Sequence, residues 1–138
     1  MANVVRKLVS TPSAPKSIGP FSQAVIVDKT MYISGFVGFD PATTTLVPGG
    51  VREQTEQTLK NIGEVLKAAG ATYNNVVKTT VLLTDMNDYA VVNEVYGKYF
   101  SENKPARAAY QIGCLPAREA KVEIEAVAVL GNIVDGKL

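Results

Sequence analysis

Helical periodicity is confined to two stretches of this sequence, and this limits the folds that it can adopt. Between residues 51 and 69, apolar side chains recur at helical spacing and predict a helix with one apolar face. They are Leu59, Ile62, Leu66 and Ala69. Gly63 interrupts this helix at a cost of about 1 kcal/mol relative to alanine, which predicts close packing there. Residues 84–88 offer capping side chains for a second helix that runs to about Phe100.

Six other stretches are typical of β-strands, because they are rich in β-branched and apolar residues and are bounded by turn residues. They are residues 4–9, 24–28, 31–35, 76–83, 105–116 and 122–129. Two helices are too few to cover both faces of six strands. We therefore predict an α+β fold, a six-stranded mixed sheet with two helices on one face. The other face would expose apolar side chains, which predicts an oligomer, most simply a closed ring.

The last two predicted strands carry the charges of greatest interest. Arg107 lies among small and apolar residues, and Glu123 and Glu125 interrupt an apolar run. The short turn at 117–120 predicts that the two strands pair as an antiparallel hairpin. Because side chains alternate along a strand, Arg107 shares its face with Ala109, whereas Glu123 and Glu125 share one face with each other.

If these two faces coincide, Arg107 lies near a glutamate in apolar surroundings, where a lone charge is costly. Two readings stay open. One is a structural Arg–Glu pair. The other is a small anion pocket, with Arg107 as the clamp for a carboxylate and Glu125 as acid or base.

Composition excludes several classes of function. The 138 residues suit one domain, 1–138, and contain no histidine, which excludes histidine-dependent nucleophiles and His-based zinc sites. No Cys/His cluster or acidic metal-loop spacing occurs, so we expect no metal. A net charge of +1 gives no reason to expect nucleic acid, and no apolar run predicts a membrane span. The single cysteine, Cys114, fits a reducing compartment, and we expect a cytoplasmic protein without excluding a mitochondrial, peroxisomal or nuclear pool.

Several polar and aromatic positions have both a structural and a functional reading. Ser34, at a strand end beside Gly35, has no base partner, so it either bonds locally or contacts a ligand. The turn at 18–22 presents Phe21 as a core plug or as a pocket wall. Asn93 is a surface residue or part of a polar site, and Tyr89 and the other tyrosines of the second helix fit a core better than a stacking platform.

Motifs along almost the whole chain resemble those of the Rid family, the reactive intermediate deaminases, also called the YjgF family, and most of all its RidA-type animal members. The segments that carry the resemblance are residues 14–15, 18–24, 32–35, 59–62, 68–70, 77–81, 92–93, 105–116 and 122–129. The resemblance implies a chorismate-mutase-like homotrimer with three sites in the clefts between subunits. It also implies hydrolysis of 2-imino and enamine acids, such as 2-aminoacrylate with its imine 2-iminopropanoate, and 2-iminobutanoate, to 2-keto acids and ammonia, with no cofactor.

By the same resemblance, Arg107 would hold the substrate carboxylate and Glu125 would orient or activate the water. Ser34 and Gly35 would line the site, together with Phe21, Tyr89, Asn93 and Ala109. The chain departs from the family pattern where Phe21 replaces a common tyrosine, Phe36 a frequent glutamine, and Ala109 a cysteine of many bacterial members. These departures bear on rate and substrate range, whereas the Arg and Glu positions are intact.

Two other functions remain as alternatives. One is an endoribonuclease or translation inhibitor, which the near-neutral charge and the lack of histidine disfavour. The other is a non-catalytic module that binds small acids or acts as a chaperone. Tight binding of 2-keto acids without imine hydrolysis would favour the module.

Overall fold

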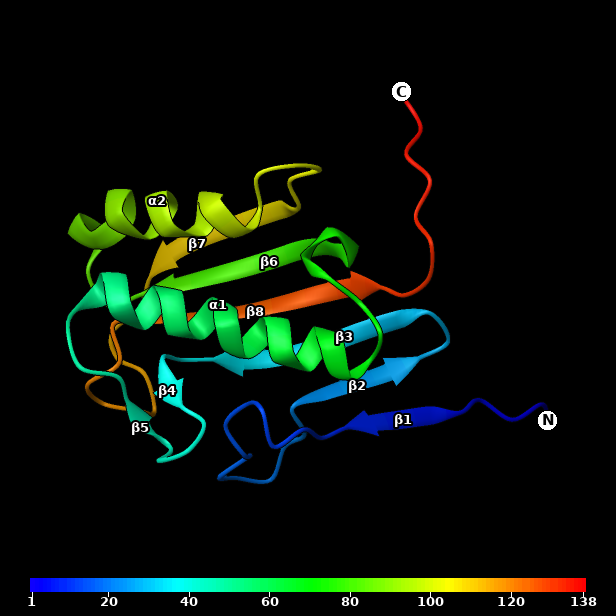
Figure 1. Ribbon diagram of the computed structural model, residues 1–138, viewed down its shortest axis with the longest axis horizontal. Helices are drawn as coiled ribbons and strands as arrows, with labels where there is room; N and C mark the ends of the chain where they lie inside the picture. Colours follow the sequence, from blue (N-terminus) through cyan, green and yellow to red (C-terminus); the bar gives the residue numbers. More distant parts are fainter.

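The computed structural model describes residues 1–138 as one six-stranded sheet with two helices on one of its faces (Figure 1). In the order in which they lie side by side, the strands are β1 (Arg6–Val9), β2 (Ala24–Val27), β3 (Thr30–Phe36), β8 (Val122–Val129), β6 (Val76–Leu83) and β7 (Ala106–Gln111). The helices are α1 (Val51–Ala68) and α2 (Tyr89–Tyr99). The chain also forms a small ribbon of β4 (Phe39–Asp40) with β5 (Thr45–Leu46), and short 3₁₀ turns at Tyr73–Asn75 and Met86–Asp88.

The sheet is mixed, as predicted, because β6 and β7 run parallel while every other neighbouring pair is antiparallel. The parallel pair arises because α2 connects β6 to β7, so the chain returns to the end from which it started. The α+β architecture is therefore confirmed.

The predicted hairpin between residues 105–116 and 122–129 is wrong, because β6 lies between β7 and β8. The connection from β7 to β8 crosses the end of β6 instead of turning tightly. The amide of Ile112 donates to the carbonyl of Leu83, and the amide of Thr84 donates to the carbonyl of Lys121. Leu115 and Ala120 of this connection are buried and pack with Val37 in a small cluster that is separate from the main core. The turn residues at 117–120 therefore shape a packed crossover.

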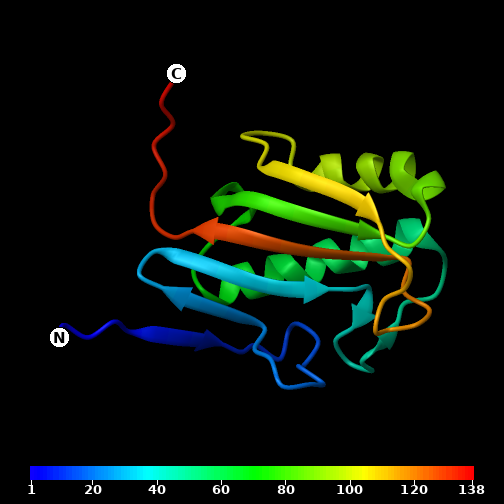
Figure 2. The same ribbon diagram turned by 180° about the vertical axis from the view of Figure 1, so that it is seen from behind.

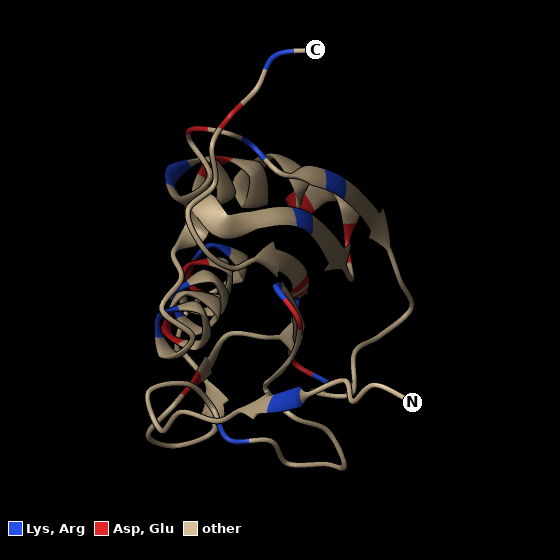
Figure 3. Cartoon of the chain, turned by 90° about the vertical axis from the view of Figure 1, so that its right-hand side faces the viewer, with Lys and Arg blue, Asp and Glu red and all other residues tan.

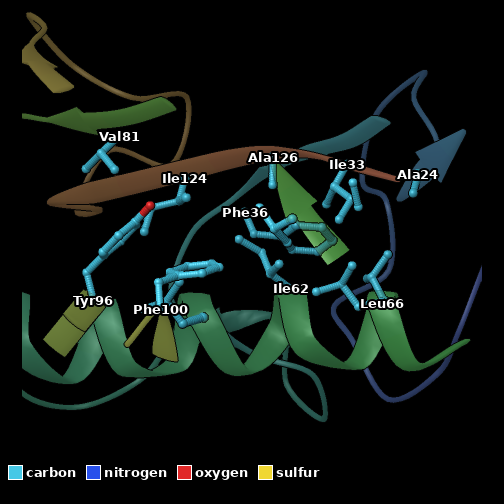
Figure 4. Packing of buried hydrophobic residues seen from close by; sticks show 14 of the residues in the cluster. Ala24, Ile33, Phe36, Ile62, Leu66, Val81, Tyr96, Phe100, Ile124 and Ala126 are labelled. Carbon is cyan, nitrogen blue, oxygen red and sulfur yellow. The ribbon is translucent and has the colours of Figure 1, made fainter. Parts of the chain in front are cut away.

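The core lies between the helices and the sheet. Leu59, Ile62 and Leu66 of α1 are fully buried, which confirms the predicted apolar face of this helix. Figure 4 shows Ile62 and Leu66 pointing from α1 toward Ile33 and Ala126 on the strands. On the strands, Ala24, Ile33, Ile124 and Ala126 face the helices and belong to the same cluster.

The opposite face of the sheet has no covering layer, as Figure 2 shows from behind. Tyr32 on β3 and Tyr110 on β7 remain 53% and 51% exposed, and Leu8 on β1 is 63% exposed. We call this side the open face. Neither helix combines the length and the apolar character needed to cross a membrane.

Candidate active site

Arg107 lies at the edge strand β7 and points to the helix side of the sheet, beneath α2. Its Nη1 donates to Asn93 Oδ1 at 2.8 Å and its Nη2 donates to Tyr89 Oη at 2.9 Å. Its Cζ lies 4.8 Å from the ring centroid of Tyr96 and 5.6 Å from that of Tyr89. Residues 89, 93 and 96 share one face of α2 because they are spaced four and three apart. The structure thus brings together three of the predicted site residues, Arg107, Tyr89 and Asn93.

The guanidinium of Arg107 has no carboxylate partner in this chain. The one salt bridge joins Arg52 to Glu94 between the two helices, at 3.0 Å on the exposed surface. Of the five N–H donors of an arginine, Asn93 and Tyr89 occupy two, so three remain for another acceptor. A half-buried cation with neutral partners and free donors is suited to bind an anion such as a carboxylate.

A second group of predicted site residues lines a cavity of about 330 Å³ at the end of β3. Phe21, Ser34 and Gly35 all contribute to it, together with Glu123. Phe21 is 53% exposed, so the turn at residues 18–22 forms a wall of this cavity and is not a plug of the core.

The cavity wall is held in place by Gln23, whose side chain is buried. Its amide donates to the carbonyls of Thr11 and Pro15, and its Oε1 accepts from the amide of Thr11 at 2.7 Å. The hydroxyl of Ser34 donates to the carbonyl of Ser22 at 2.6 Å. Ser34 therefore makes the local bond of the structural reading while it also lines the cavity.

Gly35 allows a carboxylate to lie against the backbone of β3. The pairing of Ile33 with Ala126 and of Phe36 with Ile124 leaves one extra residue on β3, a β-bulge. A Cβ on Gly35 would lie 2.7 Å from Cδ of Glu123 and 2.8 Å from its Oε2, which is too close. Only glycine leaves the space that the Glu123 carboxylate occupies.

Glu123, and not Glu125, borders the cavity. Glu123 is half-buried, and its pKa is raised above the usual glutamate value, first because burial disfavours the charged form and then because Glu125 lies nearby. Glu125 is exposed on the open face, where it pairs with Thr80 of β6. The sequence pattern does not separate two glutamates that share one strand face, so it gives no reason to choose Glu123 over Glu125 as the acid or base.

Arg107 and the two glutamates lie on opposite faces of the sheet. On β6, Thr79 pairs with Arg107, while the next residue, Thr80, pairs with Glu125. Successive side chains point to opposite faces, so the face of Arg107 and the face of the two glutamates do not coincide. The reason is the insertion of β6, whose register the sequence does not reveal. Within a single chain, therefore, Arg107 neither pairs with a glutamate nor shares a pocket with one.

Ala109 and Cys114, the remaining positions considered from the sequence, lie outside the two groups of site residues. Ala109 faces the helix layer two residues beyond Arg107 and packs, partly buried, against the core. Cys114 is exposed and unpaired. The structure contains no group of three or more Asp, Glu, Cys or His side chains that could hold a metal ion.

Comparison with known proteins places this chain among close relatives. A family model described as "Endoribonuclease L-PSP" matches residues 11–130. The chain is 60% identical to the 2-iminobutanoate/2-iminopropanoate deaminase of Mus musculus over 134 residues, which are 97% of this chain and 98% of the mouse protein. It is 55% identical to the Homo sapiens protein of the same name over 138 residues, the full length of both.

Solved structures agree with this relationship. RidA from an Antarctic Psychrobacter species superposes with a TM-score of 0.86 at 46% identity, covering 90% of this chain and 99% of that one. Escherichia coli TdcF with bound serine superposes with a TM-score of 0.85 at 36% identity, covering 91% and 99%. This chain therefore belongs to the Rid family, also known as the YjgF or L-PSP family.

Proposed function

We propose that this protein is a hydrolytic deaminase that converts 2-iminobutanoate and 2-iminopropanoate, with their enamine forms, into 2-keto acids and ammonia. The observation that carries the proposal is the Arg107 guanidinium, which has free donors and no anionic partner in its own chain. All substrates of this class carry a carboxylate beside the reacting carbon. The close full-length relatives named for this activity support the same substrate class.

In this proposal Arg107 binds the substrate carboxylate with two parallel hydrogen bonds. Each hydrogen bond to a charged group contributes about 1.5–3 kcal/mol. Such a clamp fixes the position of the adjacent imine carbon, which a water molecule must reach. The serine bound to TdcF is likewise a small molecule with an α-carboxylate, which supports a ligand of this kind.

Glu123 acts on the water. The substrate reacts as the protonated iminium: the carboxylate of Glu123 accepts a proton from the water while the water oxygen bonds to the imine carbon, which gives a neutral carbinolamine. Glu123 returns that proton to the amine nitrogen and then accepts the hydroxyl proton as the C=O bond forms and the C–N bond breaks. The keto acid leaves, and ammonia takes the last proton from Glu123 and leaves as ammonium. Burial, and then the charge of Glu125, raise the pKa of Glu123, which makes its carboxylate a better proton acceptor than an ordinary glutamate.

Glu125 is the alternative acid or base, carried over from the family motif. The two glutamates are distinguished by Glu123→Gln and Glu125→Gln variants assayed side by side. The lining of the cavity by Glu123 supports the prediction that the first variant loses most of kcat while the second retains it.

We further propose that the protein is a chorismate-mutase-like homotrimer with sites shared between subunits. Arg107 and Glu123 lie on opposite faces of one sheet, so a single chain does not bring them to one substrate. Arg107 lies on an edge strand, where a neighbouring subunit has room to approach. The open face, with Tyr32 and Tyr110 about half exposed, offers apolar area for the contact.

The experiment that tests function measures ammonia and 2-keto acid release from 2-aminoacrylate or its four-carbon homologue, generated in the assay by a dehydratase. The wild-type protein should accelerate release and Arg107→Ala should not. If the wild type binds 2-oxobutanoate but does not accelerate release, the non-catalytic module replaces the deaminase.

Mixing of subunits tests the shared site. Arg107→Ala and Glu123→Gln proteins should each be inactive, whereas a mixture refolded together should regain up to about a quarter of wild-type activity. This fraction follows because about one in four interfaces of a random ring joins an intact Arg107 to an intact Glu123. A mixture that stays inactive, or a protein that sediments as a monomer, would refute the shared trimeric site.

The description of the family model leaves endoribonuclease activity as a second candidate. Figure 3 shows Lys and Arg positions interspersed with Asp and Glu positions along the chain, and the net charge is only +1, which gives little of the positive charge that RNA binding favours. Nuclease activity that co-purifies with the oligomer and disappears in Arg107→Ala would restore this candidate.

A further inference from the structure

Tyr96 of α2 packs against Arg107 and has no part in the mechanism described so far. It is 8% exposed, and its ring centroid lies 4.8 Å from Cζ of Arg107, closer than the ring of Tyr89. Figure 4 shows Tyr96 extending from α2 toward the strands. A cation over an aromatic face at this distance is attracted by the negative face of the ring.

Two contacts fix the orientation of the Tyr96 ring, one through its hydroxyl and one through its ring face. Its hydroxyl is hydrogen-bonded to the hydroxyl of Thr79 at 2.6 Å, and Thr79 is 1% exposed on β6. Its ring packs against Phe100 with centroids 4.6 Å apart. Because a buried hydroxyl without a partner is costly, the Thr79 bond keeps the phenol in this orientation. Thr79 pairs with Arg107 in the sheet, so the hydroxyl that holds Tyr96 and the guanidinium that Tyr96 contacts lie on the same face of the sheet.

The chain stabilises the Arg107 cation without a counter-ion. Its two hydrogen-bond acceptors, on Asn93 and Tyr89, are neutral, and the ring of Tyr96 contributes attraction without using any N–H donor. A carboxylate in place of Tyr96 would pair with the guanidinium and compete with the substrate. An aromatic ring orients the guanidinium plane and leaves its free donors available.

We propose that Tyr96, anchored by Thr79, is a positioning residue that orients the Arg107 guanidinium for the carboxylate of the substrate. The benefit to turnover rests on the proposed deaminase function. The orientation itself is a property of the ligand-free protein and is measured separately.

The test replaces Tyr96 with tyrosines that carry one, two and three ring fluorines and keep the hydroxyl that bonds to Thr79. Fluorine withdraws electron density from the ring face with little change of shape, so it weakens cation–π attraction without opening a large cavity. Tyr99 receives the same series as a matched control. It lies on the same helix, bonds to Glu56 and packs against Tyr73, and makes no contact with Arg107.

Two kinds of measurement are made on each variant, one of Arg107 mobility and one of ligand affinity. The first is the order parameter of the Arg107 Nε–H by NMR in the ligand-free protein, which should fall with each fluorine at position 96. The second is KM for imine hydrolysis together with Kd for 2-oxobutanoate. Both should rise by roughly 3- to 30-fold across the series, because cation–π attraction of this size shifts affinity by such a factor, with little change in kcat. The series at position 99 should change neither quantity.

An Arg107 order parameter that ignores fluorination at position 96, or that responds equally at position 99, overturns the proposal. Because this readout needs no substrate, it decides the role of Tyr96 even if the wild-type protein proves unable to hydrolyse imines. Thr79→Val gives an independent check. It should lower the Arg107 order parameter by freeing the ring, and an unchanged value would contradict the role of the anchor.

Discussion

For Gly63→Ala, helix propensity and tertiary structure predict opposite changes in the free energy of unfolding. Gly63 lies inside α1, where alanine is favoured by about 1 kcal/mol. A Cβ at this position would lie 2.2 Å from Oη of Tyr73 and 2.7 Å from its Cζ. Tyr73 is not free to move aside, because its hydroxyl donates to the carbonyl of Leu59 at 2.7 Å. The structure thus confirms the close packing expected at Gly63 and predicts destabilisation.

The magnitude follows from what Tyr73 would lose on displacement. Its hydrogen bond to Leu59 contributes about 0.5–1.5 kcal/mol. Its edge-on contacts with Tyr99 and Phe100, with centroids 5.3 and 5.7 Å apart, contribute about 0.5–1.5 kcal/mol each. After the gain in helix propensity, we expect the free energy of unfolding to fall by about 0.5–3.5 kcal/mol.

Urea denaturation at one fixed protein concentration measures this change, since association affects apparent stability. Gly97→Ala on α2 is the matched control, because a Cβ there would meet no atom within 4 Å. It should stabilise the protein by up to about 1 kcal/mol. In a Tyr73→Phe background, Gly63→Ala should cost less than in the wild type. Equal stabilisation by Gly63→Ala and Gly97→Ala would refute the reasoning.

Other predictions concern the proposed site. Arg107→Lys keeps the charge but loses the planar fork, so kcat/KM should fall roughly 10- to 100-fold with an unchanged circular dichroism spectrum; full activity would exclude the clamp. The acid limb of the pH–rate profile should lie above the ordinary range of a glutamate, since burial and then the charge of Glu125 raise the pKa of Glu123. Glu125→Gln should move that limb to lower pH, and an unmoved limb would show that another group sets it. Because the raised pKa of Glu123 means that the folded state holds its proton more tightly, the stability from this group is present in acid and is lost as pH rises through the folded pKa. Glu123→Gln should therefore stabilise the protein at neutral pH and not in acid, as judged by unfolding at both pH values.

Much of the fold could be predicted from local periodicity. The apolar spacing in residues 51–69 and the alternation in residues 122–129 report directly which side chains are buried, and α1 and β8 follow them closely. The face shared by Arg107 and Ala109, and the one shared by Glu123 and Glu125, follow from the same period of two. The family motifs brought in Tyr89 and Asn93, and the structure places both against Arg107.

A contact between neighbouring strands decides which of Glu123 and Glu125 borders the cavity. Both residues alternate with apolar neighbours in the same way, so no local signal separates them. The difference is that Glu123 lies beside Gly35, whose missing side chain leaves room for the carboxylate. Such a contact joins residues almost ninety positions apart, and no pattern within one strand reports it.

The sequence by itself determined the two helices, the six strands of the main sheet, the buried face of α1 and the absence of histidine, since each of these depends only on residue type and spacing. Tertiary structure alone decided which strands lie beside β6. The turn at 117–120 predicted a hairpin, but β6 lies between β7 and β8 because its pairing to both forms a continuous core beneath the helices. That insertion sets Arg107 and Glu123 on opposite faces of the sheet, because pairing partners, and not distance along the chain, determine which side chains face the same side.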